Sequence, residues 1–354
     1  ERYADNGYSL PVGAAVYAVR IVEGVDQPAY ELYEAGGGAF TLDFWPASTI
    51  KLLSSVAALE FAGARGFTGA ARMSWDSGYN DLLASIYDRA IRDSSNPDYD
   101  RTLRVAGLDW LNTEFLTAER GFPNVVITSP YGGLPVRDIP GLTMTEGTLS
   151  DYTPARGTAG DYGSNDTNLF ELVEGLRRVL SHDEIPEAHR FALAAADLAG
   201  LRDALCGSTV KYFGNGVRAV LGADASICNK YGFVPTADCL DHAMVQTADG
   251  SERFFVAAVI PAVDCDARLG EIAEQTLLAL RTSPEATPLE LDAGTPIVVQ
   301  VDDLGSDGAA RQIRFTIDAP GADRVLASID GDGAEEQIGT SRFTVERSFV
   351  AGGD

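Results

Sequence analysis

Residues 46–64 of this 354-residue chain read PASTIKLLSSVAALEFAGA, and this stretch decides the fold. Pro46 is typical of the first turn of a helix, and Gly63 and Gly66 mark the end of one. Between them, apolar residues fall on nearly every side of a 3.6-residue helical period, which is the pattern of a helix enclosed by other elements. The sequence therefore predicts a buried central helix that the rest of the chain must cover.

Alternating and periodic runs elsewhere in the chain predict a mixed α+β fold. Residues 122–165 are rich in Gly, Pro, Thr and Asp and are predicted to be a long irregular stretch of the kind that carries functional loops. Strands are predicted at residues 14–19, 29–33, 40–42, 216–221, 226–233, 242–247 and 254–263. Further helices are predicted at residues 79–93, 109–119, 168–180, 187–205 and 267–281.

The composition changes after the last of these helices, where residues 282–288 read TSPEATP. This composition is typical of a linker. We expect residues 1–282 to form one domain, residues 283–294 to link it to a second, and residues 295–354 to form a small β-sandwich-like module. The module has few strands for a sandwich, so we expect it to be a domain cut short. Its strands are predicted at residues 296–301, 311–317, 324–329 and 342–349.

The charge balance excludes several classes of partner. The chain has 27 basic and 52 acidic residues, for a net charge of −25, and no run of Lys or Arg. Nucleic acids and anionic membrane surfaces are therefore not expected as partners. No apolar run approaches the ~18 residues of a membrane span. Because the chain begins at Glu1 and not at Met, we expect its N-terminus to have been processed.

Four cysteines lie within one 60-residue region, and their even number fits two disulfides in an exported protein. Proximity along the chain favours the pairs Cys206–Cys228 and Cys239–Cys265 among the three possible connectivities. The alternative is four buried free thiols in a cytoplasmic protein. We expect a secreted or periplasmic protein. The spacing of the cysteines matches no zinc motif, and neither a metal nor a cofactor is expected.

Lysine is scarce, with Lys51, Lys211 and Lys230 the only three among the 27 basic residues. Arginine supplies surface charge but cannot be deprotonated in a protein, whereas lysine can. Lys51 follows Ser48 by three residues on the central helix, so both project from one face. A lysine in apolar surroundings has a lowered pKa and can act as a base. Each lysine is therefore a candidate for acid–base chemistry, with codon bias as the alternative.

Two of these lysines fall in a series of three motifs: Ser-x-x-Lys at residues 48–51, Ser-x-Asn at residues 94–96 and Lys-x-Gly at residues 230–232. Their order resembles the penicillin-recognising serine hydrolases, and the intervening segments resemble class A β-lactamases over about residues 10–282. The resemblance implies a five-stranded antiparallel sheet flanked by helices, plus an all-helical lobe. The active site is expected between the two.

The resemblance also implies catalytic roles. Ser48 would be the acylated nucleophile, and Lys51 would accept its proton as the general base. Ser94 would relay a proton to the leaving group with the help of Lys230.

The substrate would be held by a further set of residues. Asn96 would bind a substrate amide and tie Lys51 in place. The backbone N–H groups of Ser48 and Phe233 would form the oxyanion hole. Tyr231, Gly232 and Phe233 complete the expected substrate-binding residues.

The sequence departs from the family at two points. Tyr231 stands between Lys230 and Gly232, where the family has a small Ser or Thr that helps to hold a substrate carboxylate. The family's deacylating Glu has no clear counterpart either. Within residues 143–166, the nearest acids are Glu146 and Asp151, and neither matches the family pattern. Efficient turnover of β-lactams is therefore not expected, and the acyl-enzyme would be long-lived or would use Lys51 or Lys230 for deacylation.

Several other residues have competing explanations. Lys211 matches no motif and is expected in packing or on the surface. Three aromatic residues are either pocket-lining or ordinary packing residues, namely Trp75, Tyr79 and Tyr131. The histidines are expected to be structural or solvated, namely His182, His189 and His242.

Together these observations predict a serine acyl hydrolase or transferase that forms an acyl-enzyme on Ser48. Its substrate would be a small-molecule or peptide acyl compound, namely an amide, peptide, ester or β-lactam. The C-terminal module would attach the enzyme to a cell wall, a polymer or another partner. The alternative is a non-catalytic penicillin-binding-type scaffold that kept the fold and lost turnover.

Overall fold

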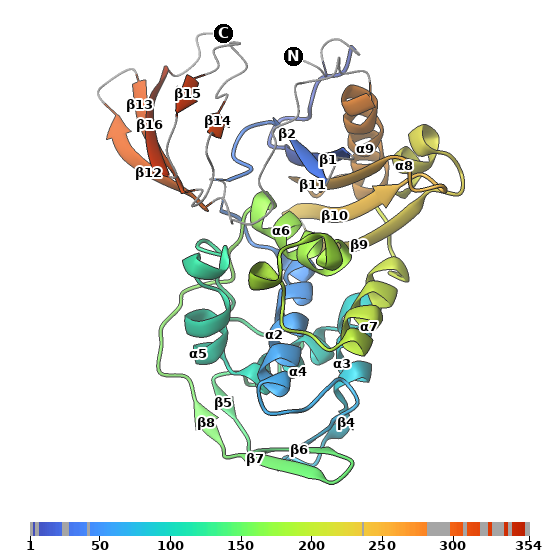
Figure 1. Cartoon of the computed structure of the whole chain (residues 1–354), viewed down its shortest axis with the longest axis vertical. Coiled ribbons are helices and arrows are strands. Elements are labelled where there is room, and N and C mark those ends of the chain that lie inside the picture. Colours follow the sequence, from blue (N-terminus) through green and yellow to red (C-terminus); the bar gives the residue numbers. More distant parts are fainter. Residues whose placement is uncertain are drawn as a thin grey trace.

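The fold was analysed in a computed structural model of the chain, which describes residues 3, 7–22, 28–40, 43–235 and 237–281 and five strands between residues 298 and 350. A five-stranded sheet lies above a helical lobe (Figure 1). In the part of the chain that the structure describes, no helix is long and apolar enough to cross a membrane.

The sheet is antiparallel throughout, in the order β2-β1-β11-β10-β9. Its strands are β1 (Ala15–Val22), β2 (Ala29–Ala35), β9 (Ser226–Val234), β10 (Asp238–Gln246) and β11 (Arg253–Pro261). Strand β11 reads RFFVAAVIP and is buried along nearly all its length, as expected for a strand covered on both faces. Strand β9 lies at one edge of the sheet, so its outer edge has no neighbouring strand and is free to face the helical lobe.

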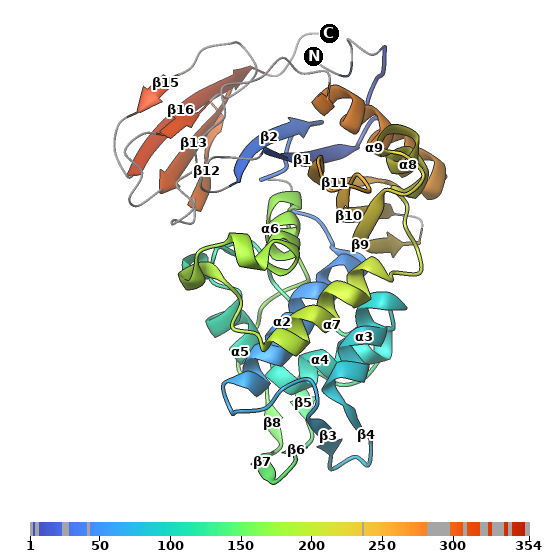
Figure 2. The ribbon, with the colours of Figure 1, turned by 45° about the vertical axis from the view of Figure 1, so that its right-hand side comes forward.

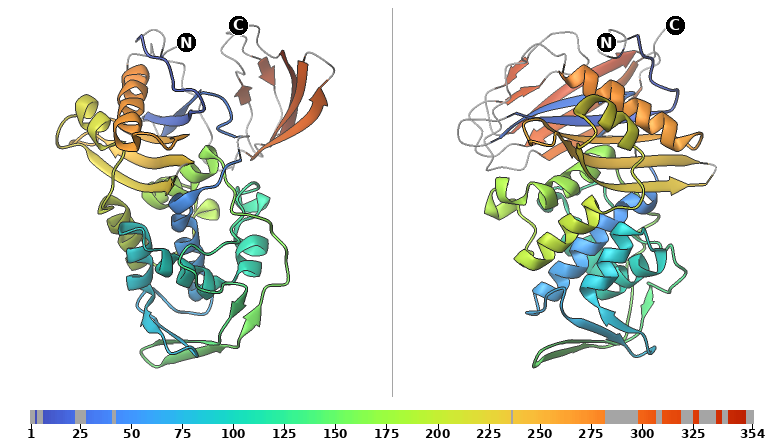
Figure 3. Two further views of the ribbon diagram at one scale, coloured as in Figure 1. Left: turned by 180° about the vertical axis from the view of Figure 1, so that it is seen from behind. Right: turned by 90° about the vertical axis from the view of Figure 1, so that its right-hand side faces the viewer.

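Helices α8 (Gly214–Leu221) and α9 (Cys265–Arg281) cover one face of the sheet and lie side by side (Figure 3). They approach closely because each has a glycine at the crossing. A Cβ on Gly216 would lie 1.8 Å from the backbone oxygen of Gly270. The core on this side consists of apolar side chains from alternate positions of the strands, among them Val16, Phe254 and Ile260.

The helical lobe is built around α2 (Lys51–Gly63), which follows a short 3₁₀ helix, η1 (Ala47–Ile50). Every residue of α2 from Lys51 to Ala62 is buried, which confirms the predicted central helix. The surrounding helices are visible in Figure 2: α3 (Leu83–Arg92), α4 (Asn96–Ala106), α6 (Leu169–Leu180) and α7 (Ala195–Cys206). Helix α6 also packs against β10 and β11, and thereby joins the lobe to the sheet.

Some predicted elements were wrong. Residues 216–221 form part of helix α8, not a strand, and their buried side chains Val217 and Leu221 are four apart, as a helix requires. The predicted helix at 109–119 is broken into α5 (Leu108–Trp110), a π-helical turn η2 (Leu111–Phe115) and a 3₁₀ turn η3 (Ala118–Arg120). The predicted helix at 187–205 begins only at Ala195, after two 3₁₀ turns, η4 (His182–Glu184) and η5 (Glu187–His189).

Two more differences concern helices, and one predicted strand falls largely outside the described residues. Helix α3 is shorter than predicted because β4 (Asn80–Leu82) occupies its start. Helix α4 was not predicted, although Ser95 caps it by accepting a hydrogen bond from the Asp98 N–H. Of the predicted strand at residues 40–42, residues 41–42 lie outside the described residues.

The stretch at residues 122–165 is not irregular throughout. It contains β5 (Asp138–Ile139), β6 (Leu142–Glu146), β7 (Leu149–Thr153) and β8 (Arg156–Gly157). Strands β6 and β7 join β3 (Arg72–Trp75) and β4 in a four-stranded sheet, which lies at the end of the helical lobe farthest from β9 (Figure 1). Their many Thr, Ser and Asp residues concealed the alternation that identifies a strand.

The structure confirms both predicted disulfides, Cys206–Cys228 and Cys239–Cys265. The free-thiol alternative is therefore wrong, because none of the four cysteines is unpaired. The first disulfide joins α7 to β9, and the second joins β10 to α9.

In the C-terminal region, the described strands form a three-stranded antiparallel sheet, β12-β13-β16, and a separate pair, β14-β15. Most of the predicted linker lies outside the described residues, and the domain boundaries stay predictions. The bounds are β12 (Val298–Ser306), β13 (Ala310–Asp318), β14 (Val325–Ala327), β15 (Glu336–Ile338) and β16 (Arg342–Val350).

Candidate active site

Lys51, the first residue of α2, brings the first two sequence motifs together. Its side chain is fully buried. Its Nζ donates to the backbone oxygen of Ser94 at 2.6 Å and to Oδ1 of Asn96 at 2.5 Å, and it lies 3.3 Å from Oγ of Ser94. Residues 43 and 45 positions apart in the chain therefore meet around one amine.

Ser48 lies in η1, one turn before Lys51, whose backbone N–H donates to the Ser48 carbonyl oxygen. The residue before it, Ala47, has a φ of 47°, in the left-handed region that a non-glycine residue rarely adopts. Such strain persists only where the surroundings enforce it, and it concentrates at functional sites. Ser48 itself is half-buried, so a substrate can reach it.

Lys230 brings the third motif to the same place. It lies on β9 and is fully buried, and its Nζ donates to Oγ of Ser94 at 2.9 Å and to the backbone oxygen of Tyr231 at 3.0 Å. Oγ of Ser94 thus lies between two lysine nitrogens. Ser94 has a φ of 56°, another non-glycine residue held in the left-handed region. Of the three non-glycine residues with positive φ in the described part of the chain, Ala47 and Ser94 adjoin the candidate chemistry, and Asp264 directly precedes α9.

Burial shifts the pKa of both lysines downward. Burial lowers the pKa of Lys51 to about 7, although the negative charges of Asp100 and Asp98 oppose the shift. Burial, followed by the charge of Lys51, lowers the pKa of Lys230 well below its usual range. A neutral Lys51 that donates to Ser94 and Asn96 keeps its lone pair, which can accept a proton.

Strand β9 approaches η1 closely at Gly232. A Cβ at this position would lie 3.1 Å from the Ala47 Cβ, the Pro46 backbone oxygen and the Thr49 Cγ2. Any other residue would push β9 away from the helix that carries Ser48. Phe233 follows directly, and its side chain is 47% exposed. The geometry explains Gly232, while the oxyanion hole predicted at the N–H groups of Ser48 and Phe233 stays a prediction.

Tyr131 packs against the candidate site and not elsewhere in the lobe. Its ring stacks on that of Tyr99, with centroids 4.6 Å apart, and the two ring centroids lie 6.0 and 5.9 Å from Nζ of Lys51. The sequence does not single out Tyr99, because an aromatic residue inside a helix resembles any other core residue. The other two aromatic candidates, Trp75 and Tyr79, contact each other near the small sheet and are packing residues.

Neither acid considered for deacylation lies near Lys51. Glu146 accepts hydrogen bonds from the backbone N–H and the hydroxyl of Thr68 in the far part of the lobe. Asp151 pairs with Arg65 at 3.7 Å. Both belong to the small sheet (Figure 1).

A different carboxylate, Asp100, shapes the loop beside Lys51. This buried side chain accepts hydrogen bonds from the backbone N–H groups of Tyr131, Gly132 and Leu134 at 2.7 to 2.9 Å. Asp100 therefore fixes the position of Tyr131.

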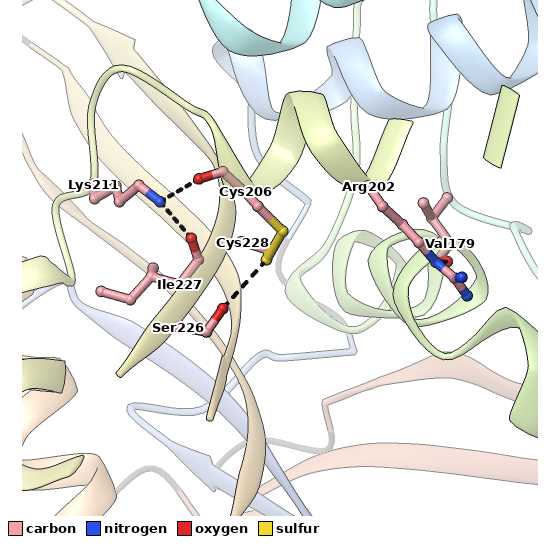
Figure 4. The surroundings of a disulfide bond; sticks show 7 residues. All are labelled: Val179, Arg202, Cys206, Lys211, Ser226, Ile227 and Cys228. Carbon is pink, nitrogen blue, oxygen red and sulfur yellow. Dashed lines mark hydrogen bonds between the residues drawn. A yellow bond between two sulfur atoms is a disulfide. The ribbon is translucent and has the colours of Figure 1, made fainter. Parts of the chain in front are cut away.

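The remaining candidates have structural positions. Nζ of Lys211 donates to the backbone oxygens of Cys206 at 2.6 Å and Ile227 at 2.5 Å, beside the first disulfide (Figure 4). Nε2 of His182 lies 3.1 Å from the backbone oxygen of Phe191. His242 is buried opposite Lys230 on β10, and burial lowers its pKa to about 3, so it is neutral.

Comparison with known proteins identifies the fold. No protein-family model and no curated protein matches the sequence. A mutant of PBP-A, solved as an acyl-enzyme complex with penicillin G, is 17% identical with a TM-score of 0.54, over 76% of this chain and 90% of that one. The chromosome-encoded β-lactamase of Vibrio parahaemolyticus is 13% identical with a TM-score of 0.53, over 77% and 95%.

A β-lactamase from Desulfarculus baarsii is 16% identical with a TM-score of 0.55, over 80% of this chain and 97% of that one. At such identities the likeness concerns the fold. The chain has the mixed α+β fold of class A β-lactamases and PBP-A, which confirms the predicted five-stranded sheet. The predicted all-helical lobe is wrong in one respect, because the lobe also contains the small sheet of β3, β4, β6 and β7.

Proposed function

We propose that this protein is a serine acyl hydrolase or transferase that forms an acyl-enzyme on Ser48. One observation carries the proposal. The fully buried Lys51, one helical turn from Ser48, donates to Ser94 and Asn96 and has a pKa lowered to about 7. Burying an amine is costly, and a base with a pKa near neutrality is what activation of a serine requires.

Acylation would proceed in two stages. Neutral Lys51 removes the proton from Oγ of Ser48 as this oxygen forms a bond to the substrate carbonyl carbon. The N–H groups of Ser48 and Phe233 stabilise the negative charge that develops on the carbonyl oxygen. When the bond to the leaving group breaks, Oγ of Ser94 transfers a proton to it. Lys51 and Lys230 both contact Ser94 and can resupply that proton.

Deacylation is expected to be slow. Within the described part of the chain, the side chains that hydrogen-bond Lys51 are those of Ser94 and Asn96, and the rings of Tyr99 and Tyr131 lie alongside. None of these is a carboxylate, and the nearby carboxylate of Asp100 is engaged by three backbone N–H groups, so a water molecule near the acyl-enzyme would depend on Lys51 or Lys230 for activation. The protein would therefore accumulate its acyl-enzyme.

The setting of the enzyme is also a proposal. Two disulfides fit an extracellular or periplasmic protein. We further propose that the C-terminal strands belong to a separate module that attaches the enzyme to a cell wall, a polymer or another partner.

The slow deacylation and Tyr231 also support a second candidate, a binding scaffold without turnover. Incubation with a fluorophosphonate, followed by intact-mass measurement, separates the two. We expect one adduct on the native protein and none on Ser48→Ala. The control is Ser55→Ala, because Ser55 lies on α2, which directly follows η1, and its hydroxyl donates to the Lys51 carbonyl oxygen. This variant should still be labelled.

An adduct that persists in Ser48→Ala would disprove the assignment of the nucleophile. If neither the fluorophosphonate nor benzylpenicillin labels the native protein, the scaffold is the better explanation.

A further inference from the structure

The Lys230 amine of the third motif is engaged by the protein itself, so it is poorly placed to bind a substrate carboxylate. A lysine ammonium has three N–H donors. Nζ of Lys230 donates to Oγ of Ser94 and to the Tyr231 backbone oxygen, and its remaining side lies 4.2 Å from the centroid of the Tyr231 ring. Two of its donors are therefore used within the protein, the Tyr231 ring lies beside the amine, and the side chain is fully buried. A neutral amine would have even fewer donors to offer.

The Tyr231 ring cannot easily leave this position. It contacts the ring of Tyr212 edge-on, with centroids 5.7 Å apart, in a geometry that aromatic pairs favour. Directly opposite on β10 is Asp241, which is buried and accepts a hydrogen bond from Nδ2 of Asn229 at 2.8 Å. Tyr231 and Asp241 share a face of the sheet. A buried carboxyl group therefore lies near the Tyr231 ring. Among the described residues, no cationic side chain other than Lys230 bonds to Tyr231.

Positive charge is scarce around the site as a whole. Among the described residues, the cationic side chains that hydrogen-bond to any member of the three motifs are Lys51 and Lys230. Both have a lowered pKa because of burial. A substrate carboxylate brought here would lose its hydration and meet two amines whose charged form burial disfavours, which is unfavourable.

The exposed surface beside Ser48 is aromatic. Trp45, three residues before Ser48, is 37% exposed, and its ring centroid lies 5.7 Å from that of Tyr131. Phe233, next to the glycine that touches η1, is 47% exposed. Besides these two, Tyr152 on the distant small sheet is the other exposed large aromatic residue in the described part of the chain. Exposed aromatic groups on both sides of η1 suit an apolar ligand group.

We infer that the site acts on neutral acyl compounds that carry apolar groups and no carboxylate beside the scissile carbonyl, and that Tyr231 determines this preference. The inference rests on the proposed acyl-enzyme at Ser48. For a neutral ester, the bond from Oγ of Ser48 to the carbonyl carbon forms and the carbon–oxygen bond to the alcohol breaks. The alcohol takes up the proton that Ser48 lost. Water then releases the carboxylic acid and restores the Ser48 hydroxyl.

Benzylpenicillin and its methyl ester provide a matched pair of probes, because they differ only in the carboxylate. In both, attack by Ser48 opens the lactam ring and the ring nitrogen takes the proton. We expect the methyl ester to acylate the native protein at least about tenfold faster than the acid, as followed by intact mass over time. A site that binds the carboxylate would show the opposite order, and that result would overturn the inference.

Variants test the role of Tyr231 itself. Tyr231→Thr opens the space beside Nζ of Lys230, and we expect the ratio of the two rates to move by about tenfold toward the acid. Tyr231→Phe keeps the ring and should keep the native ratio. Tyr152→Thr makes the same change on the small sheet and should alter neither rate. If Tyr231→Thr folds and leaves the ratio unchanged, Tyr231 does not determine the preference. If it fails to fold, the ratio on the native protein still decides the substrate class.

Labelling by the fluorophosphonate separates the two levels of the proposal. If Ser48 is labelled and the acid reacts faster than the ester, the acyl-enzyme mechanism stands and the substrate class is wrong. If Ser48 is not labelled by any of the probes, the mechanism itself fails.

Discussion

The two faces of the central sheet are both buried, yet they differ in chemistry. The face under α8 and α9 is packed by a continuous set of apolar side chains, with the hydrogen-bonded pair Asn229 and Asp241 near its edge. The face toward the helical lobe instead buries two amines, Lys51 and Lys230, against Ser94. Apolar packing contributes stability, whereas a buried amine lowers it. Groups retained at such a cost are the best candidates for function.

The largest effect is expected at the polar face. Lys51→Met removes the proposed base, and we expect the rate of fluorophosphonate labelling to fall by about 10³-fold, within the range known for general bases. Lys211→Met is the control, because Lys211 is the one lysine outside the motifs and bonds only to backbone oxygens. It should lower the free energy of unfolding by about 1–2 kcal/mol and leave labelling unchanged. Equal labelling rates in Lys51→Met and Lys211→Met would contradict the role of Lys51 as the base.

The apolar face should respond in the opposite way. Phe254 is fully buried under α8 and α9, and Phe254→Ala leaves a cavity that we expect to cost about 3–5 kcal/mol of unfolding free energy. Urea unfolding measures this loss. Molecules that remain folded should still label at Ser48 at nearly the native rate. A large drop in the labelling rate, with stability unchanged, would show that residues of the apolar face also contribute to the reaction at Ser48.

The pH dependence of labelling sharpens the comparison. Lys51 acts as a base only when neutral, and burial lowers its pKa to about 7. The labelling rate should therefore rise about tenfold per pH unit below pH 7 and level off above it. A rate that is flat between pH 5 and 8 would contradict the role of Lys51.

The same lowered pKa affects stability. Between pH 7 and 10.5 the unfolded chain keeps the Lys51 proton that the folded protein has lost, so this residue makes stability rise with pH across that interval. Chemical unfolding at several pH values measures the slope. Lys51→Met should lose this contribution while keeping those of all other groups.

The smallest effect on the labelling rate is expected from the two disulfides, which form another matched pair. They span 22 and 26 residues, so chain entropy predicts a similar stabilisation of about 3 kcal/mol from each. Of the two disulfides, Cys206–Cys228 is the one that joins the strand of Lys230 to the helical lobe. Replacing both of its cysteines with Ala should slow labelling severalfold and shift its pH dependence, whereas the Cys239 and Cys265 replacements should affect stability alone. Equal rates in the two double variants would show that the first disulfide does not position Lys230.

The motif residues can be found from sequence because their chemistry demands particular residue types at short spacings. The i, i+3 spacing places Ser48 and Lys51 on one helix face. The scarcity of lysine makes all three lysines candidates, and the Lys-x-Gly motif separates Lys230 from Lys211. The strands β5–β8 were missed because their polar residues alternate weakly. Residues 216–221 were misassigned because Val and Leu at short spacings suit a strand or a helix equally well.

The sequence by itself determined the central helix, the mixed α+β class and the three motifs, and it favoured the cysteine pairing that the structure confirms. These depend on local periodicity, residue type and proximity along the chain. Only the tertiary structure decided that Oγ of Ser94 lies between two buried amines, that Tyr99 and Tyr131 stand beside Lys51, and that the Tyr231 ring covers Lys230. Most of these contacts join residues that are dozens of positions apart. Burial and pKa depend on everything packed around a group, and that is settled when the sheet and the lobe come together.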